Sequence, residues 1–287
     1  MKITFSATNI KRESEAILHV AFSGKDYDEA VVLNGIRTLV LGVKDKDAVN
    51  TRNFPLIVRR MVRHAQKVKV QTVVCVFSDF LFPNIGTDEP KIARVFARNA
   101  GLANYNFNEY RTVELDHSIK EMIIVGVVAP DVKNAFQKGL TESEEINKMR
   151  DMANIPGGDM SPAILASMIK SNLKKLPVKV TVLGEKEMKK LKMEAILAVG
   201  RGSKEESKFI EMVYSGGKAS EAPIVLVGKG VTFDTGGINL KPTNGLLGMN
   251  MDMSGGAAVA QTIALCARLK IKKNIVGLVP AVKNMNS

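Results

Sequence analysis

Short apolar runs alternate with amphipathic runs along most of this 287-residue chain, and this alternation constrains the fold more than any other feature. In the first 135 residues, helix-like runs at 48–67 and 89–104 separate the apolar runs. The strand-like runs there are 2–6, 16–22, 38–43, 70–77 and 121–128. Strands that alternate with helices predict an α/β domain with a largely parallel sheet.

A polar helical stretch at 131–155 predicts a connecting helix between two domains, 1–130 and 156–287. Pro156 and two glycines end that helix, and Ser161-Pro162 is typical of the start of another. The α/β pattern then resumes with predicted helices at 162–175, 185–192 and 254–270. The strands predicted in this half are 178–183, 195–199, 209–214, 222–227 and 274–282, and we expect 222–227 to be buried.

The net charge of +12 raises the question of nucleic-acid binding. The excess is spread along the chain, and its densest cluster, 186–192, has Met188 and Leu191 as an apolar side. This pattern favours a solvated helix face over a phosphate groove. Aromatic residues make up 5% of the chain and Trp is absent, which disfavours base stacking. Nucleic-acid binding is possible but unsupported.

Several patterns indicate a cytoplasmic protein. No apolar run reaches the roughly 18 residues that span a bilayer, and the N-terminus lacks the apolar core of a signal peptide. Cys75 and Cys266 lie in apolar runs and are expected to be small buried residues without a disulfide framework. His19, His64 and His117 lack metal-ligand spacing, so we interpret them as structural or surface residues.

A glycine-rich stretch from 227 to 257 carries isolated charges: Lys229, Asp234, Lys241 and Asp252. Charges on loops at strand ends are commonly functional, although a solvated loop is the alternative. A phosphate cradle at 228–230 is weakly indicated, because a strand-like run follows instead of a helix. A second possibility is an anion site at the start of the helix from 254, where two glycines would leave N–H groups accessible.

A metal site is the third interpretation. Asp234 and Asp252 are hard oxygen ligands suited to Zn, Mn or Mg. Lys229 would be an unusual ligand, since only a neutral amine has a lone pair, and a nearby dication favours that form. Lys241, kept protonated, could hold a substrate carbonyl oxygen as charge develops on it. Spacing alone leaves the three interpretations open.

The segments GKGVTFDTGGINLKP (228–242) and MNMDMSGGAA (249–258) resemble the cytosolic leucine aminopeptidase family, which are two-metal, typically hexameric exopeptidases. Similarity extends over about 150–285, through 150–162, 193–203, 211–214 and 275–285. The resemblance implies an N-terminal macro-domain-like α/β domain, then an incomplete α/β metallopeptidase catalytic domain with a mixed central sheet. The first 130 residues fit the family only in size and α/β pattern.

The resemblance also implies roles for individual residues. Asp234 aligns with the carboxylate that bridges two Zn or Mn ions, and Lys229 and Asp252 align with ligands of the second ion. Lys241 aligns with the catalytic lysine that polarises the scissile carbonyl, and Met249 with a residue of the pocket for the first side chain. The implied reaction is attack of metal-activated water on the N-terminal peptide bond of a peptide substrate, in a homo-oligomer.

The chain departs from the family pattern in one major respect. The family's next motif, Asn-Thr-Asp-Ala-Glu-Gly-Arg, does not occur in it, so the first metal keeps only Asp234 among its ligands. Asn250 and Met251 also replace a lysine and a tyrosine of many members. We therefore expect an open apolar sheet edge, weak binding of one dication and little or no hydrolysis by this chain. The alternative is a non-catalytic relative that binds nucleic acid or a protein partner.

Overall fold

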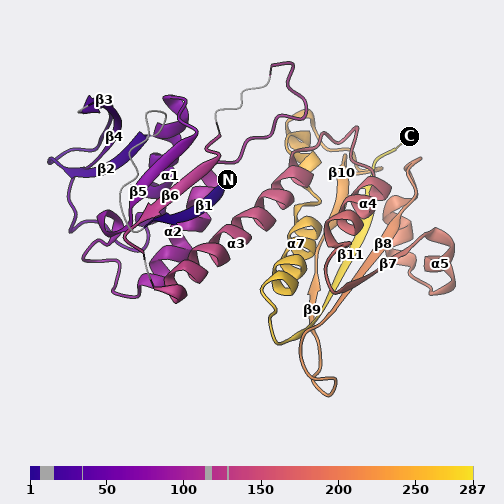
Figure 1. Ribbon diagram of the computed structural model, residues 1–287. Helices are drawn as coiled ribbons and strands as arrows, with labels where there is room; N and C mark the ends of the chain where they lie inside the picture. The colour runs from indigo at the N-terminus through magenta and orange to yellow at the C-terminus, as the bar shows by residue number, and fades with distance from the viewer. Residues whose placement is uncertain (7–15, 34, 114–117, 128, 287) are drawn as a thin grey trace. The chain divides into compact units, whose positions relative to one another are not determined.

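The computed structural model describes residues 1–6, 16–33, 35–113, 118–127 and 129–286 (Figure 1). They divide into two compact units, Met1–Glu144 and Glu145–Ser287, and the division falls inside helix α3, Pro130–Asn154. None of the helices in the described part of the chain is long and apolar enough to cross a membrane. The domain bounds drawn from the sequence remain a prediction.

The first unit is built on a six-stranded sheet in the order β1-β6-β5-β2-β4-β3. All neighbouring strands pair in parallel except β3 and β4, which form an antiparallel hairpin. The strands are β1 Lys2–Ser6, β2 Ala16–Phe22, β3 Tyr27–Leu33, β4 Ile36–Val43, β5 Thr72–Val76 and β6 Glu121–Val125. The helices are α1 Phe54–Lys67, η1 Phe77–Phe80 and α2 Glu89–Ala103. The predicted α/β class is confirmed.

Phenylalanine side chains pack against one another within the largely aliphatic core of this unit. Phe96 packs edge-on against Phe80, with ring centroids 4.9 Å apart, and against Phe136 of α3 at 5.7 Å. Edge-to-face packing of this kind adds to the free energy gained by burial. His64 is buried, and its Nε2 lies 2.8 Å from the Glu29 carbonyl oxygen. His19 is exposed. The prediction that each is a structural or a surface residue is confirmed for these two histidines. His117 lies outside the described residues.

Strand β3 was not predicted, because it has the weakest pattern of the sheet. It lies at the sheet edge with β4 as its one partner among the described strands, and most of its residues are exposed. Asp28 and Glu29 interrupt its apolar residues, and acidic residues are depleted in strands. Pairing with β4, which no local pattern reports, therefore decides its conformation.

The second unit holds a five-stranded mixed sheet with the order β10-β11-β8-β7, and β9 also pairs with β11. Both β9 and β10 run parallel to β11, whereas β8 is antiparallel to β11 and β7. The strands are β7 Val178–Leu183, β8 Lys208–Ser215, β9 Ile224–Val227, β10 Gly230–Asp234 and β11 Asn274–Asn284. The helices are α4 Pro162–Leu173, α5 Glu185–Lys190, α6 Glu194–Gly200, η2 Thr243–Leu246, η3 Met249–Met251 and α7 Ser254–Arg268.

Three local predictions in this unit are wrong. The run expected as a strand at 195–199 is helix α6, because a short apolar run has no period that separates helix from strand. The strand expected to be buried at 222–227 is β9, whose side chains are largely exposed, since no described strand pairs with its outer edge. Cys75 is buried as expected, but Cys266 is only half-buried.

Candidate functional site

The turn between β9 and β10 is tied directly to the start of α7. The Gly256 N–H donates to the Lys229 carbonyl at 2.7 Å. A Cβ on Gly228 would lie 2.5 Å from the Gly255 carbonyl oxygen, so only glycine fits there without a shift. This contact disfavours an anion site at α7, because one of its two glycine N–H groups is already used. A phosphate cradle is also disfavoured, since the chain continues from Lys229 into strand β10.

A bulge in β10 sets the direction of Asp234. Val231 pairs with Val282 of β11, and Phe233 pairs with the next residue of β11, Lys283. Thr232 is therefore the extra residue of β10. Thr232 is fully buried, and its hydroxyl donates to the Val282 carbonyl at 3.4 Å. Bulges re-aim side chains and are frequent next to active sites. Here the bulge pairs Asp234 with Asn284.

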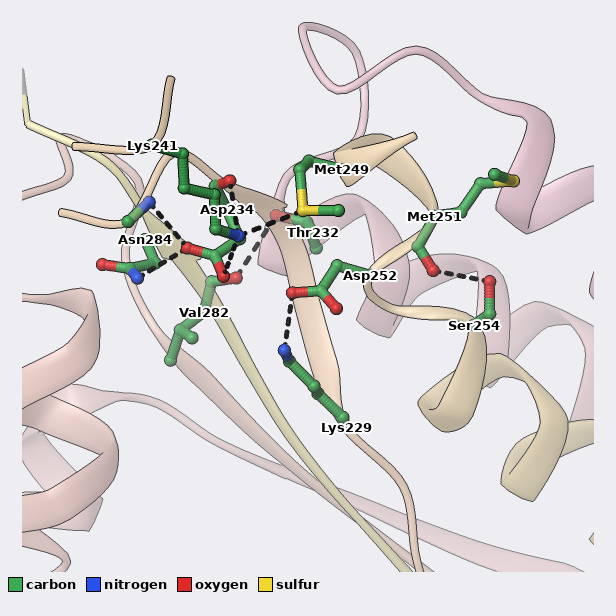
Figure 2. A network of polar contacts seen from close by, with 11 residues as sticks. Lys229, Thr232, Asp234, Lys241, Met249, Met251, Asp252, Ser254, Val282 and Asn284 are labelled. Atoms are coloured by element: carbon green, nitrogen blue, oxygen red, sulfur yellow. Dashed lines mark hydrogen bonds and ion pairs between the residues drawn. The ribbon is translucent and has the colours of Figure 1, made fainter. Parts of the chain in front are cut away.

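Asp234 is the most densely hydrogen-bonded carboxylate of the stretch (Figure 2). Its Oδ2 accepts from Lys241 Nζ at 2.6 Å. Its Oδ1 accepts from Asn284 Nδ2 at 2.7 Å and from the Gly236 N–H at 2.9 Å. Burial by itself would raise the pKa of this carboxyl, but the three donors and the lysine charge outweigh it and lower the pKa. The carboxylate is therefore held in its charged form.

The loop after β10 turns back so that Lys241 reaches Asp234. Gly236 and Gly237 both have positive φ, at 92° and 65°, which favours glycine at each position. The Lys241 N–H donates to the Thr235 carbonyl at 2.9 Å and closes the loop. Lys241 Nζ also lies 3.2 Å from the Asp234 carbonyl oxygen and 3.1 Å from Met249 Sδ. The loop thus brings Lys241, Asp234 and Met249 together.

Lys229 and Asp252 form the second charged pair of the site. Lys229 Nζ lies 2.7 Å from Asp252 Oδ2, and the carboxylate is the more buried partner, at 19% exposed. The Asp252 Oδ2 atom is buried, yet the pair is not aligned as a hydrogen bond and no other described group donates to it. Figure 2 shows the Asp252 side chain pointing toward Lys229. Asp252 Oδ2 is therefore paired with the Lys229 charge but lacks an aligned hydrogen-bond donor, so a cation could use this oxygen once Lys229 moves away or becomes neutral.

The donor set fits one divalent cation incompletely. Asp234 and Asp252 offer carboxylate oxygens, and Lys229 offers an amine once it is neutral. Within the described residues, no group of three or more His, Cys, Asp or Glu is arranged to hold a metal ion. A cation at this site would therefore have two carboxylates and at most one amine as its ligands from the described residues.

Two asparagines make contacts in or beside the site that the sequence did not indicate. Asn284, which the sequence did not single out, touches Asp234 from a strand fifty residues further along the chain. No local signal marks it, since parallel pairing of β10 with β11 creates the contact. Asn250 donates to the Ala153 carbonyl at 3.3 Å, near the end of α3, and Met251 is half-exposed.

The basic cluster at 186–192 lies mostly on the short helix α5. Its apolar side is smaller than predicted, because Met188 is buried but Leu191 is 62% exposed. Lys189 lies 3.9 Å from Glu185, so acidic residues share the surface. A mixed, solvated surface does not favour nucleic-acid recognition.

The part of the chain that contains the site matches known proteins. Residues 147–287 match the cytosol aminopeptidase family, catalytic domain. A probable cytosol aminopeptidase of Paraburkholderia xenovorans (strain LB400) is 35% identical over 256 residues, covering 88% of this chain and 50% of the relative. One of Rickettsia peacockii (strain Rustic) is 34% identical over 263 residues, covering 90% of this chain and 52% of the relative.

Solved structures give the same result. The bottromycin maturation enzyme BotP in complex with Mn superposes with a TM-score of 0.81 and 25% sequence identity, covering 96% of this chain and 60% of that chain. The present chain spans about half the length of the curated relatives that it matches. Sequence and fold together assign this chain to the cytosol aminopeptidase family.

Proposed function

We propose that this chain forms the N-terminal domain, 1–130, a connecting helix, 131–155, and the front part of the catalytic domain, 156–287, of a metal-dependent leucyl aminopeptidase. Such an enzyme removes N-terminal amino acids from peptides. One observation carries the proposal: the family-like stretch gathers two lysine–aspartate pairs at β10 and its flanking turns, with Asp234 held by three donors.

Lys229, Asp234 and Asp252 are the proposed ligands. The Mn complex of BotP supports a divalent ion, and the family resemblance implies two, Zn or Mn. A bound dication supplies Lewis acidity to the peptide carbonyl and lowers the pKa of water. In this chain Asp234 and Asp252 would hold the cation with their carboxylates, and Lys229 would contribute its amine once that amine is neutral.

Lys241 is the proposed catalytic residue. Its ammonium group lies against Asp234 Oδ2 and Met249 Sδ, and its flexible side chain would turn toward the carbonyl oxygen of a substrate bound beside them. A cation placed there stabilises the negative charge that develops on that oxygen. Met249, in contact with the same ammonium group, would then border the pocket for the first side chain of the substrate.

This chain on its own is proposed to bind one dication weakly and to hydrolyse peptides slowly or not at all. The described residues offer two carboxylates and one amine, and a two-metal site requires more ligands than these. By family resemblance the protein acts in the cytoplasm on peptides and forms a homo-oligomer, a hexamer in the family. The non-catalytic alternative has no observation in its favour.

Mn²⁺ binding, measured by calorimetry, and hydrolysis of leucyl p-nitroanilide with added Mn²⁺ or Zn²⁺ test the proposal. We expect weak Mn²⁺ binding that Asp234→Ala abolishes and that Asp159→Ala, at an exposed aspartate, leaves unchanged. Fast turnover that Asp234→Ala removes would contradict the low activity. Absence of Mn²⁺ binding, or equal binding by Asp234→Ala, would contradict the metal assignment.

A further inference from the structure

We propose that Asn284 is a positioning residue that orients the Asp234 carboxylate for metal binding. The inference rests on the proposed function and adds a residue from outside the glycine-rich stretch. Asn284 lies near the end of β11 and is half-buried. Parallel pairing places it directly opposite Asp234 at the end of β10.

The direction of the Asn284 amide follows from chemistry. An ionised carboxylate can only accept hydrogen bonds, so the group 2.7 Å from Asp234 Oδ1 must be the NH₂ end of the amide. The Asn284 side chain is thus a fixed donor to one named oxygen.

The backbone around Asn284 limits its movement. Its carbonyl oxygen accepts from the Thr235 N–H at 2.8 Å and from the Thr235 hydroxyl at 3.1 Å. On the other side, a Cβ on Gly237 would lie 2.8 Å from Asn284 Oδ1, so the amide packs closely against that glycine. A side chain whose backbone is anchored and whose amide packs against a neighbouring loop can impose its direction on the group that it contacts.

The consequence for Asp234 is an asymmetry between its two oxygens. A carboxylate oxygen has about two acceptor positions, and Oδ1 uses both for Asn284 and the Gly236 N–H. Oδ2 has Lys241 alone. Asn284 therefore leaves Oδ2 as the oxygen that can turn to a cation, and without Asn284 only the Gly236 N–H fixes Oδ1.

The first test compares Mn²⁺ affinity in variants of the full chain. Asn284→Ala removes the donor, and Asn284→Leu removes it while keeping the side-chain size. Both are expected to weaken Mn²⁺ binding on the order of tenfold, as loss of a group that orients a ligand does. The control is Asn274→Ala, at the other end of β11, where the amide donates to the Lys218 and Glu221 carbonyls. Its affinity should stay within twofold of the wild type.

The second test needs no metal. In the ¹H–¹⁵N spectrum, the side-chain NH₂ signal that Asn284→Ala removes should shift in Asp234→Ala but not in Asp252→Ala. Equal Mn²⁺ affinity of the wild type and both Asn284 variants would overturn the proposal. An Asn284 NH₂ signal that does not shift in Asp234→Ala would also overturn it. If the wild type binds no Mn²⁺, the metal function fails and Asn284 has no metal ligand to orient, so that result overturns the proposal too. Equal urea midpoints for Asn284→Ala and Asn274→Ala show that folding is not the cause.

Discussion

Lys241 Nζ and Asp234 Oδ2 lie 2.6 Å apart, so the lysine takes the carboxylate oxygen that a cation would use. Lys229 Nζ likewise lies 2.7 Å from Asp252 Oδ2 and takes that carboxylate oxygen. Each aspartate of the site thus has an internal counter-charge. A dication that binds here has to displace or neutralise these ammonium groups.

Lys241→Gln should tighten Mn²⁺ binding about three- to tenfold, because it removes a competing cation from a partly buried carboxylate. The same variant should remove any leucyl p-nitroanilide hydrolysis that the chain has. Calorimetry at constant pH measures the first effect. Lys208→Gln, which breaks the pair with Glu206 away from the site, is the matched control. Weaker Mn²⁺ binding in Lys241→Gln would show that the lysine assists the metal instead of competing with it.

The lowered pKa of the Asp234 carboxyl predicts a pH-dependent contribution to stability. A carboxyl with a folded-state pKa below its unfolded value of about 3.9 stabilises the fold above that value. The contribution is lost as the pH falls through the folded-state pKa. The difference in unfolding free energy between wild type and Asp234→Asn should therefore shrink between about pH 5 and pH 2.

Urea unfolding at several pH values measures that difference. Asp159→Asn, at an exposed aspartate, serves as the control for the substitution itself. A difference that stays constant down to pH 2 would mean that Asp234 gains nothing from its three donors.

Gly228→Ala should destabilise the second unit by about 2–4 kcal/mol, because the added methyl group meets the Gly255 carbonyl and the Gly256 α-carbon. Gly158→Ala is the matched control, since a Cβ there meets nothing within 4 Å and should change stability by about 0.5 kcal/mol or less. Urea midpoints compare the two. Equal midpoints would contradict the close contact between the β9–β10 turn and α7.

The two thiols should react slowly with iodoacetamide at pH 8 in the folded protein. Burial, and then the charge of Asp79, raise the pKa of the Cys75 thiol far above its usual range, and burial raises the pKa of Cys266. Cys266 should react first, because it is only half-buried. Labelling followed by mass spectrometry, with Cys75→Ala and Cys266→Ala to assign the products, measures the order. Faster labelling of Cys75 would show that the core of the first unit opens readily.

Most elements were predictable because their signals are local. The helix that begins after Ser161 shows this: the Ser161 side chain accepts from the Ile164 N–H, as its position before Pro162 predicts. Strand β11 and helix α7 also fall where periodicity indicated them. Periodicity failed for α6, β3 and the burial of β9, where strand partners or packing outweigh local preference.

The sequence by itself determined the α/β alternation and the order of Lys229, Asp234, Lys241 and Asp252 along one glycine-rich stretch. Both are properties of neighbouring residues, so they can be read without a fold. Tertiary structure alone decided which lysine pairs with which aspartate and that Asn284 holds Asp234. Those contacts depend on a bulge in β10, on two glycines with positive φ and on pairing with a strand fifty residues away, and none of them leaves a local pattern.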